Sequence, residues 1–262
     1  MREAIQKELV RIERSENVRL LLAVESGSRA WGFESTDSDW DVRFVYVHRP
    51  DWYLSIRPRR DVLEFPISEG LDVSGWDLPK ALRLFAKSNP PMLEWLRSPI
   101  VYQEVFGAAS RLRGLSTEFF APRSCLHHYL HMAVGNFRTY LQGERVRVKK
   151  YFYVLRPVLA CLWIEHRVEF PPMEFQRLVE GELPDGPVRH RTLELLERKR
   201  RGEELQEGPR IDELNDFLQD TIEHVQELVA AQPLGPPPDL ARLDGVFHEA
   251  LREAWPDDAA AT

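Results

Sequence analysis

Residues 22–47 constrain the fold more than any other stretch of the chain. An apolar run ends at Glu25-Ser26, a Gly27-Ser28 turn follows, and a second apolar run closes at residues 44–47. Asp39 and Asp41 come just before that second run, each followed by an apolar residue. The pattern predicts a strand, a turn, a short helix with a loop, and a second strand that starts at the two aspartates.

The two aspartates are typical of a metal site. Side chains alternate between the faces of a strand, so Asp39 and Asp41 should project to the same side. Two like charges held side by side are costly unless a cation neutralises them, and Mg2+ prefers carboxylate oxygens and keeps positions open for phosphates. The Gly27-Ser28 turn supplies main-chain N–H groups that favour an anion. Together these features indicate phosphoryl or nucleotidyl transfer.

The same stretch resembles the active-site signature of the DNA polymerase beta superfamily of nucleotidyltransferases. That signature has Gly-Ser, a spacer of about ten residues and then Asp-apolar-Asp-apolar. Here it reads Gly27-Ser28 and Asp39-Trp40-Asp41-Val42. The alternative is an Asp-rich surface turn, but such a turn does not explain the flanking strands and the spacing together.

A two-metal site needs a third carboxylate to complete it and to act on the attacking hydroxyl. Residues 61–67 and 71–76 read as a hairpin, and Asp72 lies near the start of its second strand. Asp77 is the competing candidate, but it precedes Leu78-Pro79 at the start of a predicted helix, as an N-cap residue does. We therefore predict Asp72 as the third acid and Asp77 as a cap.

Residues 76–80 and 88–99 narrow the resemblance. They read WDLPK and SNPPMLEWLRSP, and they look like a family of predicted nucleotidyltransferases that includes the RNA-ligase-associated polymerases of bacterial RNA repair. The resemblance covers roughly residues 20–165. It implies a Mg2+-dependent nucleotidyltransferase fold and leaves the acceptor open.

The chain turns helical after Phe106, where we expect no further strands. Within a helix predicted for residues 147–167, Lys149, Tyr153 and Arg156 are spaced i, i+4, i+7 and share one face. Together with Lys150 they suit a triphosphate and a base stacked on the ring. A solvated basic edge with core aromatics is the alternative, and the resemblance of the segment KKYFYVLRP to the same family favours binding.

Composition bounds the class of protein. With 262 residues, 43% hydrophobic and 29% charged, the chain is an ordinary globular protein with no membrane-spanning run. Two cysteines, Cys125 and Cys161, form no close-spaced motif, which predicts a cytoplasmic protein. The net charge of −7 argues against a nucleic-acid coat protein. Arg198 to Arg201 could hold a nucleic-acid backbone, but neighbouring glutamates could equally pair with them.

The predicted fold is α/β plus α: a polymerase-beta-like nucleotidyltransferase core with a small mixed sheet, followed by a C-terminal helical domain. The predicted domains are residues 1–117 and 118–255, with a disordered tail at 256–262. Residues 232–238 read as a stiff linker before a last short helix.

The predicted function is Mg2+-dependent transfer of a nucleotide from an NTP such as ATP to a hydroxyl, with release of pyrophosphate. Asp39, Asp41 and Asp72 would hold two Mg2+ ions, or Mn2+, while Gly27 and Ser28 hold the outer phosphates. The family resemblance favours an RNA 3′ end as acceptor, with an RNA repair ligase as a partner. The alternatives are nucleotidylation of a protein or small molecule, and a non-catalytic nucleotide- or RNA-binding module.

Overall fold

The computed structural model describes residues 1–35, 38–68, 70–203, 205–233, 235 and 238–259. The chain forms two compact units. The first unit is formed by Met1–Ala30, Asp39–Phe119 and the described residues from 238 onward. The second unit is formed by the described residues of 31–38 and of 120–235.

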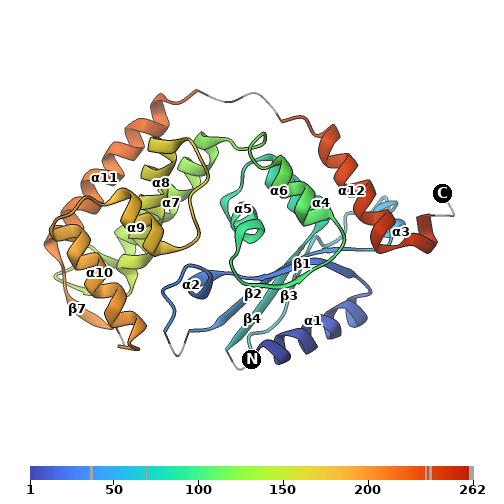
Figure 1. Cartoon of the computed structure of the whole chain (residues 1–262), viewed down its shortest axis with the longest axis horizontal. Coiled ribbons are helices and arrows are strands. Elements are labelled where there is room, and N and C mark those ends of the chain that lie inside the picture. The colour runs from blue at the N-terminus through green and yellow to red at the C-terminus, as the bar shows by residue number, and fades with distance from the viewer. Residues whose placement is uncertain (36–37, 69, 204, 234, 236–237, 260–262) are drawn as a thin grey trace. The chain divides into compact units, whose positions relative to one another are not determined.

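The elements of the first unit are α1 (Arg2–Glu16), β1 (Arg19–Glu25), α2 (Gly27–Ala30), β2 (Trp40–Val47), α3 (Pro50–Tyr53), β3 (Val62–Glu64), β4 (Leu71–Asp77), α4 (Leu78–Ala86), α5 (Pro90–Arg97), β5 (Val101–Glu104), α6 (Ala108–Leu115), α12 (Ala241–Ala254) and α13 (Pro256–Ala259) (Figure 1). Those of the second are α7 (Pro122–Tyr140), β6 (Arg145–Arg147), α8 (Lys150–Arg167), α9 (Phe175–Glu182), α10 (Pro187–Arg200), β7 (Glu207–Pro209) and α11 (Asp212–Ala231).

The first unit is built on a mixed sheet of five strands in the order β3-β4-β2-β1-β5. β2 and β4 run parallel, and the other neighbouring pairs run antiparallel. This confirms the small mixed sheet. The order of strand, short helix and strand is as predicted, but Gly27 and Ser28 are the first two residues of α2 and do not form a separate turn before it. The helices on both sides of the sheet explain why β1 is buried at every residue after Arg19.

One face of the sheet packs on α1. Ile5, Leu9 and Ile12 recur at helical spacing and form one hydrophobic cluster with Val42 and Phe44 of β2. Helices α4, α5 and α6 lie on the other side of the sheet (Figure 1). Because side chains alternate along a strand, Asp41 and Arg43 belong to the face opposite α1.

Asp77 ends β4 and occupies the N-cap position of α4, as predicted, although its side chain makes no capping hydrogen bond. The carboxylate instead accepts a hydrogen bond from the Tyr53 hydroxyl at 2.6 Å. The residue is buried, and burial raises the pKa of Asp77 to about 7.

This raised pKa predicts a pH-dependent stability. A carboxyl whose pKa is higher in the folded than in the unfolded state contributes stability that is complete below the unfolded pKa, near 4, and lost as the pH rises through about 7. Wild-type protein should therefore lose about 2 to 3 kcal/mol between pH 5 and pH 8 through this group. Asp77→Asn keeps an acceptor for Tyr53 and should lack this component in urea denaturation. An equal pH dependence in both proteins would rule it out.

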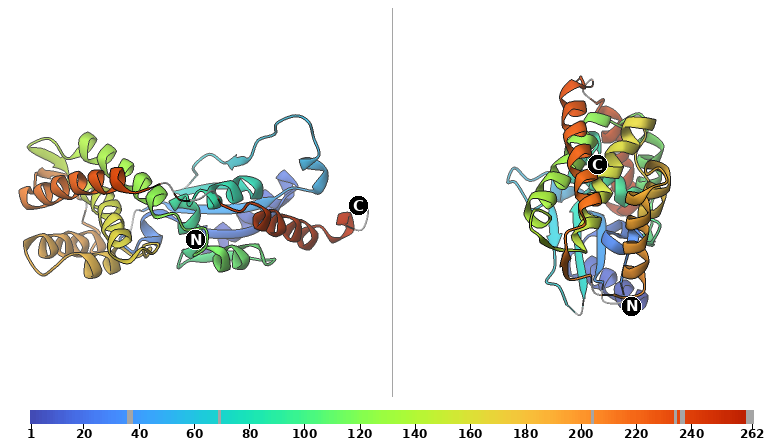
Figure 2. Two further views of the ribbon diagram at one scale, coloured as in Figure 1. Left: turned by 90° about the horizontal axis from the view of Figure 1, so that it is seen from above. Right: turned by 90° about the vertical axis from the view of Figure 1, so that its left-hand side faces the viewer.

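The second unit is mainly helical, with α7, α8 and α11 side by side (Figures 1 and 2). The helix predicted for residues 147–167 is α8, which runs through Pro157 as one helix. The expectation of no strands after Phe106 was wrong. β5 begins before that point, but β6 and β7 pair in a second, two-stranded sheet. Three-residue strands are too short to show a period of two.

Helix α12 lies in the first unit, whereas the sequence placed residues up to 255 with the helical domain. Arg111 of α6 pairs with Glu249 and Glu253 of α12, and Phe247 packs edge-on against Tyr53 with ring centroids 5.0 Å apart. These contacts are non-local, so no local pattern signals them. Of the predicted tail, Pro256–Ala259 form α13, and residues 260–262 lie outside the described residues. The domain division at residue 117 stays a prediction.

None of the described helices is both long and apolar enough to cross a membrane.

Candidate active site

Asp41 and Asp72 lie next to each other on the parallel strands β2 and β4, where they are register partners. Both carboxylates contact the same atom, because Nη2 of Arg43 donates to Asp72 Oδ2 at 2.7 Å and to Asp41 Oδ1 at 3.2 Å. The three side chains are only partly exposed, at 27% for Asp41, 29% for Asp72 and 19% for Arg43. The predicted second and third acids, Asp41 and Asp72, thus form one acid pair.

Arg43 is fixed by the main chain as well. Its Nη1 donates to the carbonyl oxygens of Asp72 at 3.0 Å and Val42 at 3.1 Å. Burial raises the pKa of Asp41, Arg43 lowers it, and Asp72 and Asp39 raise it further. Burial therefore disfavours negative charge on Asp41, and the Arg43 guanidinium already contacts both carboxylates of the acid pair.

Asp39 precedes β2 and is exposed. Its main-chain oxygen accepts a hydrogen bond from Arg29 Nε at 3.2 Å, and the Arg29 guanidinium lies 3.8 Å from the centre of the Trp40 ring. Its charge acts on Asp41, whose pKa it helps to raise. Asp39 therefore lies close enough to Asp41 for its charge to act on it.

The start of α2, at Gly27, packs directly on Asp41. Gly27 has a φ of +59°, and a Cβ placed there would lie 2.1 Å from Asp41 Oδ2. The Ser26 amide also donates to the Asp41 carbonyl oxygen at 2.8 Å. Glycine is needed here both for the left-handed conformation and for the close approach of the carboxylate. Gly27 and Asp41 are more than ten residues apart in sequence, but they are in direct contact in the fold.

Glu25 is a site residue that the sequence analysis missed. It is fully buried, and its carboxylate accepts hydrogen bonds from the Asp41 amide at 2.9 Å and the Tyr102 hydroxyl at 2.6 Å. Burial raises its pKa. Glu25 thereby ties the start of β2 to β1 and β5. No sequence pattern marks this role, because a single Glu at a strand end has many possible partners.

The donor chemistry fits a hard divalent cation. Asp41 and Asp72 already share one cationic group, the Arg43 guanidinium, and Asp39 adds a third carboxylate nearby. Within the part of the chain that the structure describes, no three acids, histidines or cysteines are gathered tightly enough to hold a metal as they stand. The acids that would hold a metal are thus present, but their carboxylates are not gathered closely enough to coordinate one ion together.

In the second unit, the predicted nucleotide-binding residues divide into two groups. Lys149 is exposed at the N-cap of α8, and the Lys150 amino group lies 4.2 Å from the centre of the Tyr140 ring and 4.8 Å from that of Tyr153. Arg156, by contrast, is 3% exposed, and its guanidinium lies 4.3 Å from the centre of the Trp31 ring. The spacing in sequence predicts which residues share a helix face, but it does not predict how exposed each of them is.

The basic cluster of residues 198–201 is largely engaged within its own unit. Arg198 pairs with Glu203 and Arg201 with Glu197. Arg200 donates to the Gly32 carbonyl oxygen at 2.9 Å. A self-paired helix end therefore describes most of this cluster better than a free nucleic-acid surface does.

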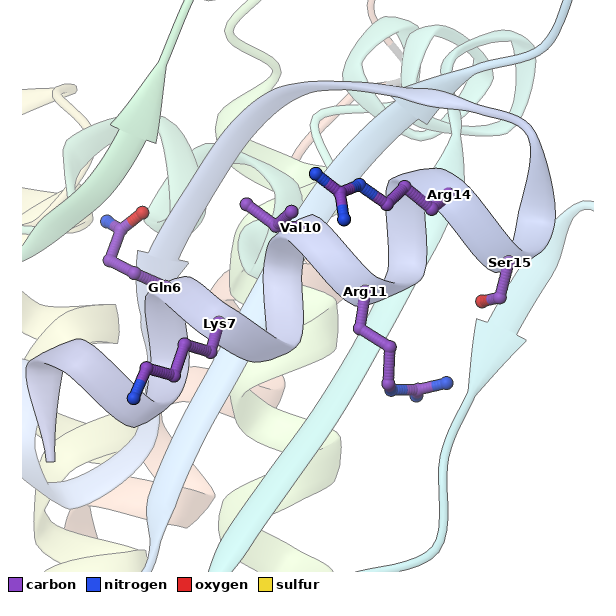
Figure 3. Close-up of a pocket in the computed structure, with 6 residues that line it drawn as sticks. All are labelled: Gln6, Lys7, Val10, Arg11, Arg14 and Ser15. Carbon is purple, nitrogen blue, oxygen red and sulfur yellow. The ribbon is translucent and has the colours of Figure 1, made fainter.

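A shallow groove of about 670 Å3 runs along α1 (Figure 3). It is lined by Gln6, Lys7, Val10, Arg11, Arg14 and Ser15. Because α1 covers the sheet face opposite Asp41, this groove is not part of the acid site.

The family model described as "RlaP: RNA repair pathway DNA polymerase beta family" matches residues 1–249. The chain belongs to this family. The match confirms the resemblance read from the Gly-Ser and Asp-x-Asp motif, and with it the polymerase-beta nucleotidyltransferase-like fold of mixed sheet and C-terminal helices.

The RlaP-family chain is also similar to a protein of Bacillus subtilis (strain 168) named YcgL. The two are 49% identical over 257 residues, which cover 98% of this chain and 99% of that one. Among solved structures, a nucleotidyltransferase-like protein from Exiguobacterium sibiricum matches 95% of this chain and 80% of its own, with 14% identity and a TM-score of 0.34.

Proposed function

We propose that this RlaP-family chain transfers a nucleotide from an NTP such as ATP to the 3′ hydroxyl of an RNA. The observation that carries the proposal is the acid pair, Asp41 and Asp72 in register on parallel strands with Asp39 close by. Association of the family with an RNA repair pathway supports RNA as the acceptor and an RNA ligase as the enzyme that joins the finished end.

In the proposed reaction, the RNA hydroxyl oxygen forms a bond to the α-phosphorus of the NTP as the bond from that phosphorus to the β-phosphate breaks. Pyrophosphate leaves with the bonding electron pair. Asp72 helps to take the proton of the attacking hydroxyl, a role that suits a carboxylate within reach of the nucleophile.

Asp39, Asp41 and Asp72 are the proposed ligands of two divalent cations, Mg2+ or Mn2+. When bound, such ions polarise the phosphate and neutralise developing charge. Because Gly27 has no side chain, it leaves room for the Asp41 carboxylate, whose Oδ2 lies where a Cβ would be. Gly27 and Ser28 are proposed to bind the outer phosphates through main-chain N–H groups.

Lys149, Lys150, Tyr153 and Arg156 are the proposed contacts from the helical unit. Lys149 and Lys150 lie at the start of α8 and can offer charge to the triphosphate. Tyr153 is half-buried and edge-on to Trp31 at 6.4 Å between ring centroids. Arg156 is proposed to act mainly through Trp31, which it stacks against.

The test is incubation with Mg2+ and each α-labelled NTP, with and without cellular RNA. Products are separated by size and by nuclease or protease sensitivity. We expect label in nuclease-sensitive material, and none with an Asp39→Ala, Asp41→Ala double variant. The matched control is Asp51→Ala, an exposed acid in the first turn of α3.

Protease-sensitive label would move the acceptor to a protein side chain, and label in a small product would indicate a metabolite. Label that persists in the double variant would exclude the acid site as its source. Absence of transfer from every NTP to RNA, protein and small molecules would contradict the proposal and favour a binding role.

A further inference from the structure

Arg43 makes four contacts with a single guanidinium. Nη2 reaches the two carboxylates of the acid pair, and Nη1 reaches the main-chain oxygens of Val42 and Asp72. A planar fork with fixed donors is held more firmly in such a position than a lysine would be. The side chain begins on β2, only two residues after Asp41, so it cannot leave the acid pair without breaking contacts on both strands.

Arg43 offsets part of the negative charge at this place without any metal. Two carboxylates on neighbouring strands repel each other, and at a few ångström this repulsion is large in a partly buried site. Arg43 provides a positive charge that both carboxylates contact. A divalent cation at the same carboxylates would therefore meet an arginine already bound there.

We propose that Arg43 is a resident counter-ion that competes with divalent metal for Asp41 and Asp72. It holds the acid pair in place while no metal is bound, and it weakens metal binding to the same two carboxylates. This inference rests on the proposed function, since it assigns metal binding to the same acids. Arg43 is a positioning residue here, because it acts through the carboxylates.

Removal of the guanidinium should thus have two opposite effects. The metal-free protein should become less stable, because the two carboxylates lose their shared counter-ion. The affinity for metal should rise, because the metal no longer has to displace or approach a positive charge. A merely structural arginine would show the first effect without the second.

The test is titration of metal-free Arg43→Gln with Mn2+, followed by electron paramagnetic resonance, with neither nucleotide nor RNA present. We expect Mn2+ to bind about tenfold more tightly to Arg43→Gln than to wild type. Arg43→Lys keeps the charge and should stay within about threefold of wild type. The control is Arg83→Gln, which removes an arginine that pairs with Asp61 on the exposed surface of α4, and should leave Mn2+ affinity unchanged.

Thermal unfolding supplies the second readout. Arg43→Gln should unfold below wild type without metal, and saturating Mn2+ should narrow this difference. Equal or weaker Mn2+ binding by Arg43→Gln than by wild type would overturn the proposal, and so would absence of Mn2+ binding by both proteins. If Arg43→Gln does not fold, Arg43→Lys takes its place: a tenfold higher Mn2+ affinity of Arg43→Lys would overturn the proposal. Nucleotide transfer by wild type with any of these results would leave the proposed function intact, and the expected Mn2+ results without transfer would refute only the proposed function.

Discussion

Asp41→Asn is expected to lower the rate of nucleotide transfer by roughly a thousand-fold, which corresponds to about 4 kcal/mol of transition-state stabilisation. The amide has the shape of the carboxylate and can still accept from Arg43 Nη2, so the fold should survive. What it lacks is the negative charge that a divalent cation needs. Asp72→Asn should have a similar effect, because both carboxylates belong to the same pair.

The measurement is kcat and KM for the labelled nucleotide, with unfolding curves for every variant. We expect the loss mainly in kcat, as for an interaction that is strongest in the transition state. Asp51→Asn is the matched control and should be as active as wild type. Activity of Asp41→Asn within tenfold of wild type, in a folded protein, would contradict a role of this acid in metal binding.

Much of the acid site could be predicted because its parts obey local rules. Asp39 and Asp41 stand out by a period of two at a strand start, and Gly27-Ser28 by turn chemistry. Asp72 was predicted from its place in a second strand, and the structure puts it in register with Asp41. Period and turn chemistry depend on neighbours in sequence, so they are readable without a fold.

The direction of Arg43 could have been predicted from the same period, since it follows Asp41 by two positions on β2. What the sequence did not contain is the partner on the other strand, because the register of β2 against β4 is a non-local property. Glu25 and Arg156 show the same limit. Their burial depends on Tyr102 and Trp31, which are distant in the chain. Charged residues are rarely buried, so their sequence pattern favours the surface.

Gly75→Ala is the substitution for which we expect the largest loss of stability, about 3 kcal/mol. Gly75 is paired with Phe44 across β4 and β2. A Cβ on Gly75 would lie 2.2 Å from Phe44 Cε2 and 2.3 Å from Cδ2. Phe44 is fully buried between the sheet and α1, so its ring has no free space to move into without disturbing the core.

Gly135→Ala is the matched control, and we expect it to change stability in the opposite direction. Gly135 lies inside α7, is exposed, and has no neighbour within 4 Å of an added Cβ. Alanine there should stabilise the helix by up to about 1 kcal/mol. Urea denaturation of both variants measures the contrast directly.

If Gly75→Ala lowers the free energy of unfolding by no more than a surface substitution does, the Phe44 ring is not confined. If Phe44→Leu restores part of the loss in the Gly75→Ala background, the ring contact is the cause, because a double-mutant cycle isolates the coupling of two touching residues.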